Sequence, residues 1–283
     1  MNDAKPVGDN AGYFESVESV EAYRQGGNAT TPPDYHRDRM RALRLLVDSM
    51  ELPDTFQVID FGCGDGMYFK DFFADYSEGR VSKIVGVDLS SPMIELAGQT
   101  LSGFPFEGHV GGAAAMKRIS EQFDVGLAID VLGYLDDEEL DVFYTEMARL
   151  IRPGGYLVVM YGNELFDMFA LNSGTARFFR KHFDVEVETL LTEGAASQYE
   201  PVRRKNPLSF GAEIAPYGFQ EVSQAFSQWH RVPPAIGNRA ADLAAARLEM
   251  RDHAFDPNDL EPAQRWKALF RSSIFASLSR KSA

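Results

Sequence analysis

Cysteine is nearly absent from this sequence. Cys63 is the single thiol among 283 residues, so the chain can form neither a disulfide framework nor a cysteine-based zinc site. This usage is typical of a reducing compartment, and we expect a cytoplasmic protein. The five histidines fall into no cluster with metal-ligand spacing, and we predict no metal site.

Long apolar runs are missing as well. No segment approaches the ~20 apolar residues that cross a bilayer. The first ten residues, MNDAKPVGDN, have no apolar core of the kind that a secretory signal requires. We therefore expect no contact with a membrane.

Basic residues are the third shortage. The 28 Lys and Arg are outnumbered by 42 Asp and Glu, which gives a formal net charge of −14. Phosphate contacts need clustered Lys and Arg, so this balance argues against nucleic-acid binding.

What remains is an ordinary globular composition, 45% hydrophobic and 25% charged. Short apolar runs alternate with segments of helical periodicity. This alternation predicts an α/β fold, a doubly wound and mostly parallel sheet with helices on both faces. The expected strands are 57–61, 83–88, 106–110, 123–129 and 156–161; the expected helices are 34–50, 67–77, 137–150 and one that Ser91 caps and Pro92 opens.

The regular alternation is lost after residue 162, and we divide the chain at that point. Two insertions would interrupt the last part of the core and cover the edge of a cleft. The predicted division is an N-terminal arm (1–33), an α/β core that holds the ligand (34–162), an inserted cap segment (163–208), a core helix and strand (209–230), a second cap insertion (231–270), and a final core strand with a tail (271–283). Within the second insertion we expect an Ala-rich helix over 238–270.

Glycines cluster directly after the first expected strand, in the segment Gly62-Cys63-Gly64-Asp65-Gly66. Such a loop lets the backbone approach a ligand where a Cβ would collide. Asp60 lies just before it, and Asp88 and Asp130 end the second and fourth strands. Because the carboxyl ends of parallel strands meet at one edge of a sheet, we expect these groups to share a cleft.

The type of ligand follows from what the loop lacks and what surrounds it. The loop does not match the G-x-G-x-x-G pattern of nicotinamide-binding folds, and the chain has no Gly-Lys-Ser/Thr of a phosphate-binding P-loop. Carboxylates around the loop would repel a pyrophosphate. They suit a ligand that carries an amine and a sulfonium.

The segment VIDFGCGDG at 58–66 resembles the first motif of class I S-adenosylmethionine (SAM)-dependent methyltransferases. IVGVDLS at 84–90 is similar to their ribose-binding strand, the segment 124–136 to their fourth strand, and LIRPGGYLV at 150–158 to the helix, turn and strand before their fifth. The resemblance covers about residues 40–161. It implies a seven-stranded sheet whose last strand is antiparallel, with SAM as the cofactor.

The resemblance also implies roles for individual residues. Glycine replaces the usual acidic residue after the third strand, at Gly112, so adenine recognition would rest on backbone groups near Ala113. The implied cofactor contacts are Asp60, Gly62 and Gly64 for the methionine part, Asp88 for the ribose, and Leu89, Met93 and Ala113 for the adenine. We add Asp130 from the fourth strand, and Tyr13 and Tyr23 from the arm, which would close over the cofactor.

We infer the chemical class of the methyl acceptor by elimination. The fourth strand lacks the Asn/Asp-Pro-Pro-aromatic segment that family members use on exocyclic amines and amides. A hydroxyl or amine of a small molecule is left, with a sugar or a natural-product intermediate ranked first. We expect His230 to take the acceptor's proton, or otherwise Asp130, Tyr134 or proximity alone; Tyr134, Trp229, Arg203 and Arg204 would contact the acceptor.

Arg203 and Arg204 favour an anionic acceptor such as a nucleotide-linked sugar, although such a run is also typical of a solvated face. Other classes stay open: a SAM-binding module without catalysis that supports a partner enzyme, a methyltransferase for a macromolecule, and a nucleotide-sugar enzyme with another cofactor. The sequence also leaves a homo-oligomer open, and it does not identify the atom that is methylated.

Overall fold

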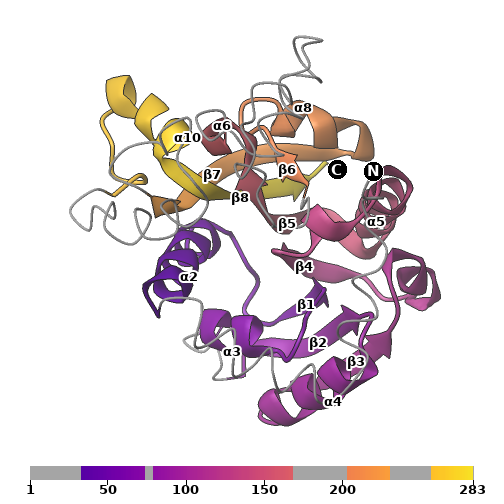
Figure 1. Cartoon of the computed structure of the whole chain (residues 1–283). Helices are drawn as coiled ribbons and strands as arrows, with labels where there is room; N and C mark the ends of the chain where they lie inside the picture. Colours follow the sequence, from indigo (N-terminus) through magenta and orange to yellow (C-terminus); the bar gives the residue numbers. More distant parts are fainter. Residues whose placement is uncertain (1–32, 74–78, 168–202, 230–255, 283) are drawn as a thin grey trace, which may run out of the picture.

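The structure is a computed structural model, and it describes residues 33–73, 79–167, 203–229 and 256–282. A β-sheet with helices around it forms its centre (Figure 1). The strand order is β3-β2-β1-β4-β5-β8-β7, and the two-residue β6 pairs with β5 beside this path. The strands are β1 (Phe56–Phe61), β2 (Val81–Asp88), β3 (Phe106–Val110), β4 (Phe123–Ile129), β5 (Ile151–Asn163), β6 (Arg204–Lys205), β7 (Phe219–Trp229) and β8 (Ser272–Lys281).

The first five strands are parallel to one another, whereas β8 runs antiparallel to both of its neighbours, β5 and β7. This confirms the predicted doubly wound sheet with seven main strands and an antiparallel last strand. The helices are α2 (Pro33–Val47), α3 (Met67–Phe73), α4 (Ser91–Thr100), α5 (Asp137–Leu150), α6 (Glu164–Asp167), α8 (Phe210–Ile214) and α10 (Trp266–Arg271), with short 3-10 turns η3 (Ala113–Arg118), η4 (Leu132–Tyr134), η6 (Ala215–Tyr217) and η7 (Pro262–Gln264).

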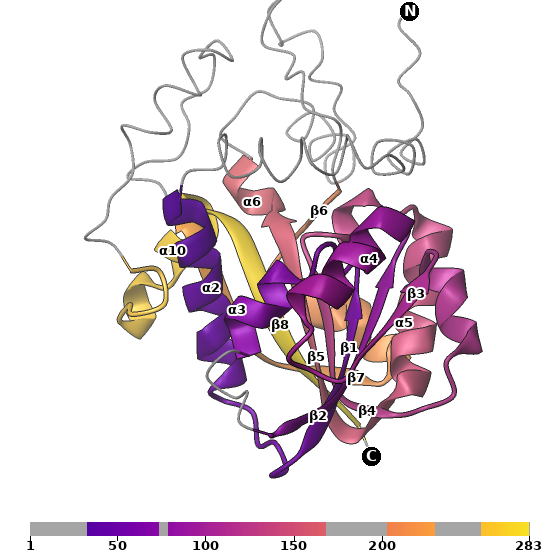
Figure 2. The ribbon, with the colours of Figure 1, turned by 90° about the horizontal axis from the view of Figure 1, so that it is seen from below.

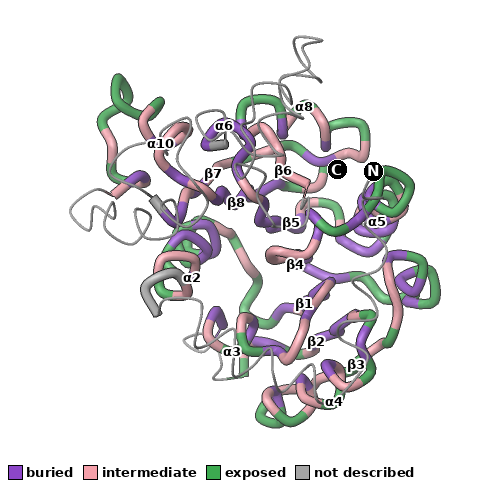
Figure 3. The backbone as a smooth tube through the Cα atoms, in the orientation of Figure 1, coloured by how far each residue is buried: buried purple, intermediate pink, exposed green. Residues whose placement is uncertain are grey.

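Two apolar cores lie on opposite faces of the sheet, because successive side chains of a strand point to opposite sides. Ile59, Val85 and Val159 belong to the core that α5 covers, whereas their neighbours Val58 and Ile84 belong to the core covered by α2 and α3. Burial on both faces explains why these strands are nearly continuous apolar runs. Figure 3 shows the same arrangement, with buried strands inside and exposed outer turns on the helices.

Three local expectations are corrected. Ser90, not Ser91, caps α4: its hydroxyl accepts from the Met93 N–H at 3.2 Å, and Pro92 lies in the first turn. β5 begins at Ile151 instead of Tyr156, because residue 151 already pairs with β4 and the Pro-Gly-Gly segment forms an irregularity within the pairing. The described part of 238–270 contains turns, η7 and α10 instead of one helix.

Candidate active site

The ends of three central strands meet at one edge of the sheet. Asp60 pairs in register with Gly86 on β2 and with Leu127 on β4, so the segments that follow β1, β2 and β4 leave the sheet side by side. Figure 2 shows these strands running toward the edge where β5 continues into α6. In doubly wound folds ligands bind at this edge, where the strand order reverses.

The glycine loop after β1 depends on a backbone that glycine adopts easily. Gly62, Gly64 and Gly66 all have positive φ, at 70°, 54° and 77°. The requirement is strictest at Gly62, where a Cβ would lie 2.4 Å from Cγ2 of Val131, just after β4. At Gly64 a Cβ would meet nothing within 4 Å. The loop is therefore packed against the β4 side at Gly62 and open at Gly64, as a backbone that receives a ligand requires.

Asp88 holds this loop in place. One carboxylate oxygen accepts from the N–H of Gly64 at 3.0 Å, and the other accepts from the N–H of Ser90 at 2.9 Å. Burial raises the pKa of Asp88, while these two backbone hydrogen bonds favour the ionised form and lower it. Each oxygen keeps a further lone pair, so the carboxylate can also accept from a pair of ribose hydroxyls.

Asp60 lies beneath the loop and is 5% exposed. Burial, and secondarily the charge of Asp88, raises the pKa of Asp60 to about 8. A buried carboxyl group beside a second carboxylate is stable either with a proton or with a cation nearby. The pair therefore fits a ligand with positive charge, which is the charge of the methionine part of SAM.

The predicted adenine contacts lie beside the ends of β2 and β3. Leu89 is 55% exposed, whereas Met93 and Ala113 are buried. Cδ2 of Leu89 would lie 3.4 Å from a Cβ on Gly112, so the segment after β2 approaches the segment after β3. An exposed leucine at this edge offers an apolar surface for a flat ring.

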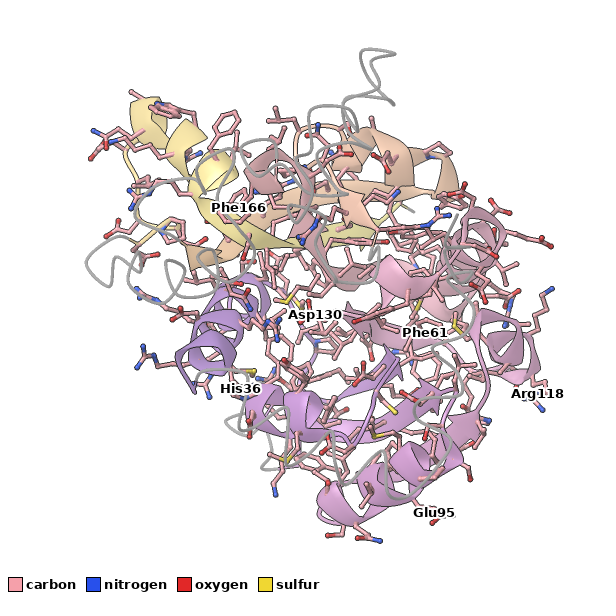
Figure 4. The ribbon with its side chains drawn as sticks, viewed as in Figure 1. His36, Phe61, Glu95, Arg118, Asp130 and Phe166 are labelled. Carbon is pink, nitrogen blue, oxygen red and sulfur yellow. The ribbon has the colours of Figure 1, made fainter. Side chains whose placement is uncertain are left out.

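Asp130 contacts a residue that the sequence analysis passed over. Nε of Arg39, on α2, lies 3.2 Å from Oδ2 of Asp130. Nη1 of Arg39 donates to the hydroxyl of Tyr68 at 2.8 Å. Figure 4 shows Asp130 near the centre of the view and His36 toward α2, whereas Glu95 and Arg118 lie at the periphery. Helical periodicity places Arg39 on α2 but gives no sign that the helix reaches this edge.

His36 lies one turn before Arg39 on the same helix. Its Nε2 is 2.8 Å from Oδ2 of Asp71, and its ring centroid is 5.2 Å from that of Tyr68. The ring is thus part of the contact between α2 and α3, as an ordinary packing role requires.

Three of the four residues predicted to contact the acceptor have described side chains, and they lie near one another. Tyr134, in η4 after β4, is 42% exposed. The N–H of Arg203 donates to the carbonyl of Gly133 at 2.7 Å, and its guanidinium pairs with Asp137. Arg204, on β6, lies against Gly162. These three residues therefore surround the ends of β4 and β5.

Some predicted residues cannot be placed. Tyr13, Tyr23 and His230 lie outside the described residues, and Trp229 ends β7 with a side chain that is not described. Within the described ranges no group of three or more potential ligands could hold a metal ion. None of the helices there is long and apolar enough to span a bilayer.

Comparison with known proteins agrees with this geometry. Residues 58–155 match the family of methyltransferase domains. A ubiquinone biosynthesis O-methyltransferase of Brucella anthropi is 26% identical over 121 residues, 42% of this chain and 46% of that protein. A ubiquinone/menaquinone biosynthesis C-methyltransferase of Syntrophotalea carbinolica is 28% identical over 169 residues, 58% of this chain and 66% of that protein. The chain spans about half the length of the first curated relatives it matches.

A solved structure of low sequence identity shows the same fold. Magnesium protoporphyrin IX methyltransferase from Synechocystis PCC 6803, solved with bound S-adenosylhomocysteine (SAH), superposes with a TM-score of 0.55 at 14% identity. The superposition covers 98% of this chain and 99% of that one. The chain therefore has the fold of class I SAM-dependent methyltransferases. Residues 58–155, which match the model of methyltransferase domains, lie within this fold.

Two glycines of the loop, Gly62 and Gly64, give the first prediction. Gly64→Ala should cost about 1–2 kcal/mol of unfolding free energy, because only the positive φ opposes it. Gly62→Ala should cost roughly 1–3 kcal/mol more, because its Cβ also overlaps Val131. Urea denaturation of both variants checks the order. Equal losses would show that Val131 moves away without cost.

The second prediction concerns pH. SAM should bind more tightly as pH rises toward about 8, because its positive charge favours ionised Asp60 while the free protein holds a proton there. The affinity gain should be at most about tenfold per pH unit, and should level off above that value. Calorimetry in buffers of different ionisation enthalpy counts the released proton.

Asp60→Asn should bind SAM without this pH dependence, and Asp54→Asn, an exposed aspartate before β1, should keep it. A native affinity that does not change between pH 6 and 8 would contradict the protonated state of Asp60.

Proposed function

We propose that this protein transfers the methyl group of SAM to a hydroxyl or amine of a small molecule, with a sugar or natural-product intermediate ranked first. The observation that carries the proposal is the loop at Gly62–Gly66 with two carboxyl groups beside it, Asp60, which is buried, and Asp88, which is half-buried. This arrangement offers backbone groups, acceptors for ribose and negative charge, which together match SAM and not a pyrophosphate cofactor.

The relatives support a small acceptor. Two of them are named for methylation at oxygen and at carbon in quinone biosynthesis. The O-methyltransferase supports a hydroxyl acceptor here. The acidic balance of the chain, −14, continues to oppose nucleic acid as a partner.

The reaction asks the protein mainly for alignment. SAM supplies an activated methyl group on a sulfonium, and transfer is an in-line displacement. The loop and Asp88 hold the cofactor half of the site, while Tyr134 and the basic pair Arg203 and Arg204 lie around the ends of β4 and β5, where an acceptor would approach. Fixing both reactants in this way removes much of the entropic part of the barrier.

Asp88 provides the third prediction. Asp88→Asn keeps the size of the side chain, but it removes the charge and leaves a single oxygen to accept from Gly64 or Ser90. Its affinity for SAM should fall about ten- to a hundredfold, the equivalent of losing charge-assisted hydrogen bonds of about 1.5–3 kcal/mol. Calorimetry measures the affinity. Asp54→Asn is the matched control, and unchanged binding by Asp88→Asn would remove Asp88 from the ribose site.

Transfer itself is tested with methyl-labelled SAM and a protein-free extract of small metabolites. Label should appear in a small molecule, together with SAH in equal amount. Binding of SAM without label transfer would favour the non-catalytic module, and label in added protein or nucleic acid would favour a macromolecular acceptor.

The fourth prediction concerns an anionic acceptor. Changing Arg203 and Arg204 together to alanine should raise the KM for the labelled acceptor about tenfold or more, as the loss of a charge-assisted contact requires. The dissociation constant of SAM should stay within about twofold, because the described contacts of these residues are with Gly133, Asp137 and Gly162. Lys117→Ala and Arg118→Ala together, on η3 away from these strands, form the control pair. An unchanged KM would leave Arg203 as a structural partner of Asp137.

A further inference from the structure

Two strained residues converge on one arginine. Among the described residues, Asp130 and Gln228 are the non-glycine residues with positive φ, at 56° and 54°. A left-handed backbone is unfavourable for most residues with a Cβ. Both side chains contact Arg39, although Asp130 follows β4 and Gln228 lies near the end of β7. Strain of this kind is held where the geometry of a side chain matters for function.

Gln228 fixes the guanidinium of Arg39. When its amide oxygen faces the arginine, this oxygen accepts from Nε at 2.9 Å and from Nη2 at 3.0 Å, and the amide nitrogen donates to the hydroxyl of Ser273 at 3.1 Å. The Ser273 hydroxyl in turn donates to the Gln228 carbonyl at 3.2 Å. Arg39 is thus bonded to Tyr68 on α3 and to Gln228 on β7, and Ser273 on β8 holds Gln228 in turn.

This arrangement leaves Asp130 paired in charge but short of hydrogen bonds. The Nε–H of Arg39 is directed to Gln228, so Oδ2 of Asp130 is buried beside the guanidinium without a hydrogen-bond donor from the protein. The side chain as a whole is still 27% exposed. Oδ2 is therefore enclosed beside Arg39 while part of the side chain stays accessible, at the strand end beside Val131 and the glycine loop.

We propose that Asp130, positioned by Arg39, Gln228 and Tyr68, accepts the proton of the acceptor's hydroxyl or amine during methyl transfer. This inference rests on the proposed function. Among the bases that the sequence left open, it selects Asp130 over His230, and it replaces the cofactor contact also expected of Asp130. Asp130 lies within the described residues, whereas His230 does not.

The step balances in atoms and charge. For a hydroxyl acceptor, the methyl–sulfur bond of SAM breaks and a methyl–oxygen bond forms, so the sulfonium becomes the neutral sulfide of SAH. The oxygen–hydrogen bond of the acceptor breaks, and its proton forms a bond to the Asp130 carboxylate. A positive sulfonium and a negative carboxylate are thus replaced by two neutral groups, and the proton later leaves to water.

The surroundings suit a carboxylate for this role. Burial raises the pKa of Asp130 above its ordinary value, which makes the carboxylate a better base, while the charge of Arg39 acts in the opposite direction and limits this rise. Tyr68, which packs on the other side of Arg39, also has a raised pKa through burial and stays protonated. Arg39 is thus the charged group that faces Asp130 from α2, and Tyr68 is the titratable group from α3.

The test compares Asp130→Asn with the native chain, in single turnovers of methyl-labelled SAM with the protein-free metabolite extract. Transfer should slow by about a hundredfold or more, the range of general-base catalysis. The dissociation constant of SAM should stay within about twofold, and Asp54→Asn should match the native chain in both measurements.

The pH profile separates a base from a merely structural aspartate. The native rate should rise with pH and level off once Asp130 is ionised, and Asp130→Asn should lose this limb. Arg39→Gln should move the limb to higher pH, because losing the positive charge raises the pKa of the neighbouring carboxyl group. Arg39→Lys should return the limb toward its native position.

The outcomes are distinct. No label transfer by the native chain would overturn the proposed function together with this inference. Transfer by Asp130→Asn within about threefold of native, or loss of transfer only in His230→Ala, would overturn the inference alone. A fall of tenfold or more in the SAM affinity of Asp130→Asn would show that Asp130 contacts the cofactor instead. The assignment would also be overturned if the rate of Arg39→Gln rose over the same pH range as the native rate.

Discussion

The hydrogen bonds of Asp88 are the interaction on which the candidate site depends. Its two oxygens accept from Gly64 and Ser90, so one side chain connects the loop after β1 to the beginning of α4. The same serine caps α4. The glycine loop can then keep its left-handed backbone, since a carboxylate from the neighbouring strand sets its position.

Charge determines what such an edge can bind. Asp60, Asp88 and Asp130 lie at the ends of three strands, and burial raises the pKa of each of them. On the acceptor side, Arg39 neutralises Asp130 at 3.2 Å. On the cofactor side, two carboxyl groups share a region without a paired arginine or lysine among the described contacts. A cationic cofactor and a proton-bearing acceptor are the ligands that suit these two halves.

The connection between the halves runs through secondary structure that is distant in sequence. Arg39 comes from the helix before β1, and Gln228 from a strand that follows the inserted segment. Asn163 makes a second connection of this kind: it is buried at the end of β5, and its amide donates to the carbonyls of Leu269 and Ser272. The edge that binds ligand is thereby joined to the elements at the end of the chain.

The sequence by itself determined the strands, the glycine loop and the three acidic strand ends, because these depend on local patterns. Alternation of apolar runs and helices predicts the parallel sheet, and a glycine between an aspartate and a helix indicates a loop that receives a ligand. The bounds of β3, β4 and α5 agree with the prediction to the residue. Predictions failed where pairing between strands sets the bounds of a strand. Pairing with β4 makes β5 begin at Ile151, before the Pro-Gly-Gly segment.

Only the tertiary structure decided which side chains meet at this edge. Nothing in the periodicity of α2 separates Arg39 from Arg37 or Arg41, which lie on the same helix and are more exposed. The difference arises because α2 packs against α3, β7 and β8. This packing directs Arg39 toward Asp130, Tyr68 and Gln228. A contact between residues almost two hundred positions apart is set by the packing of whole elements, and no local pattern contains it.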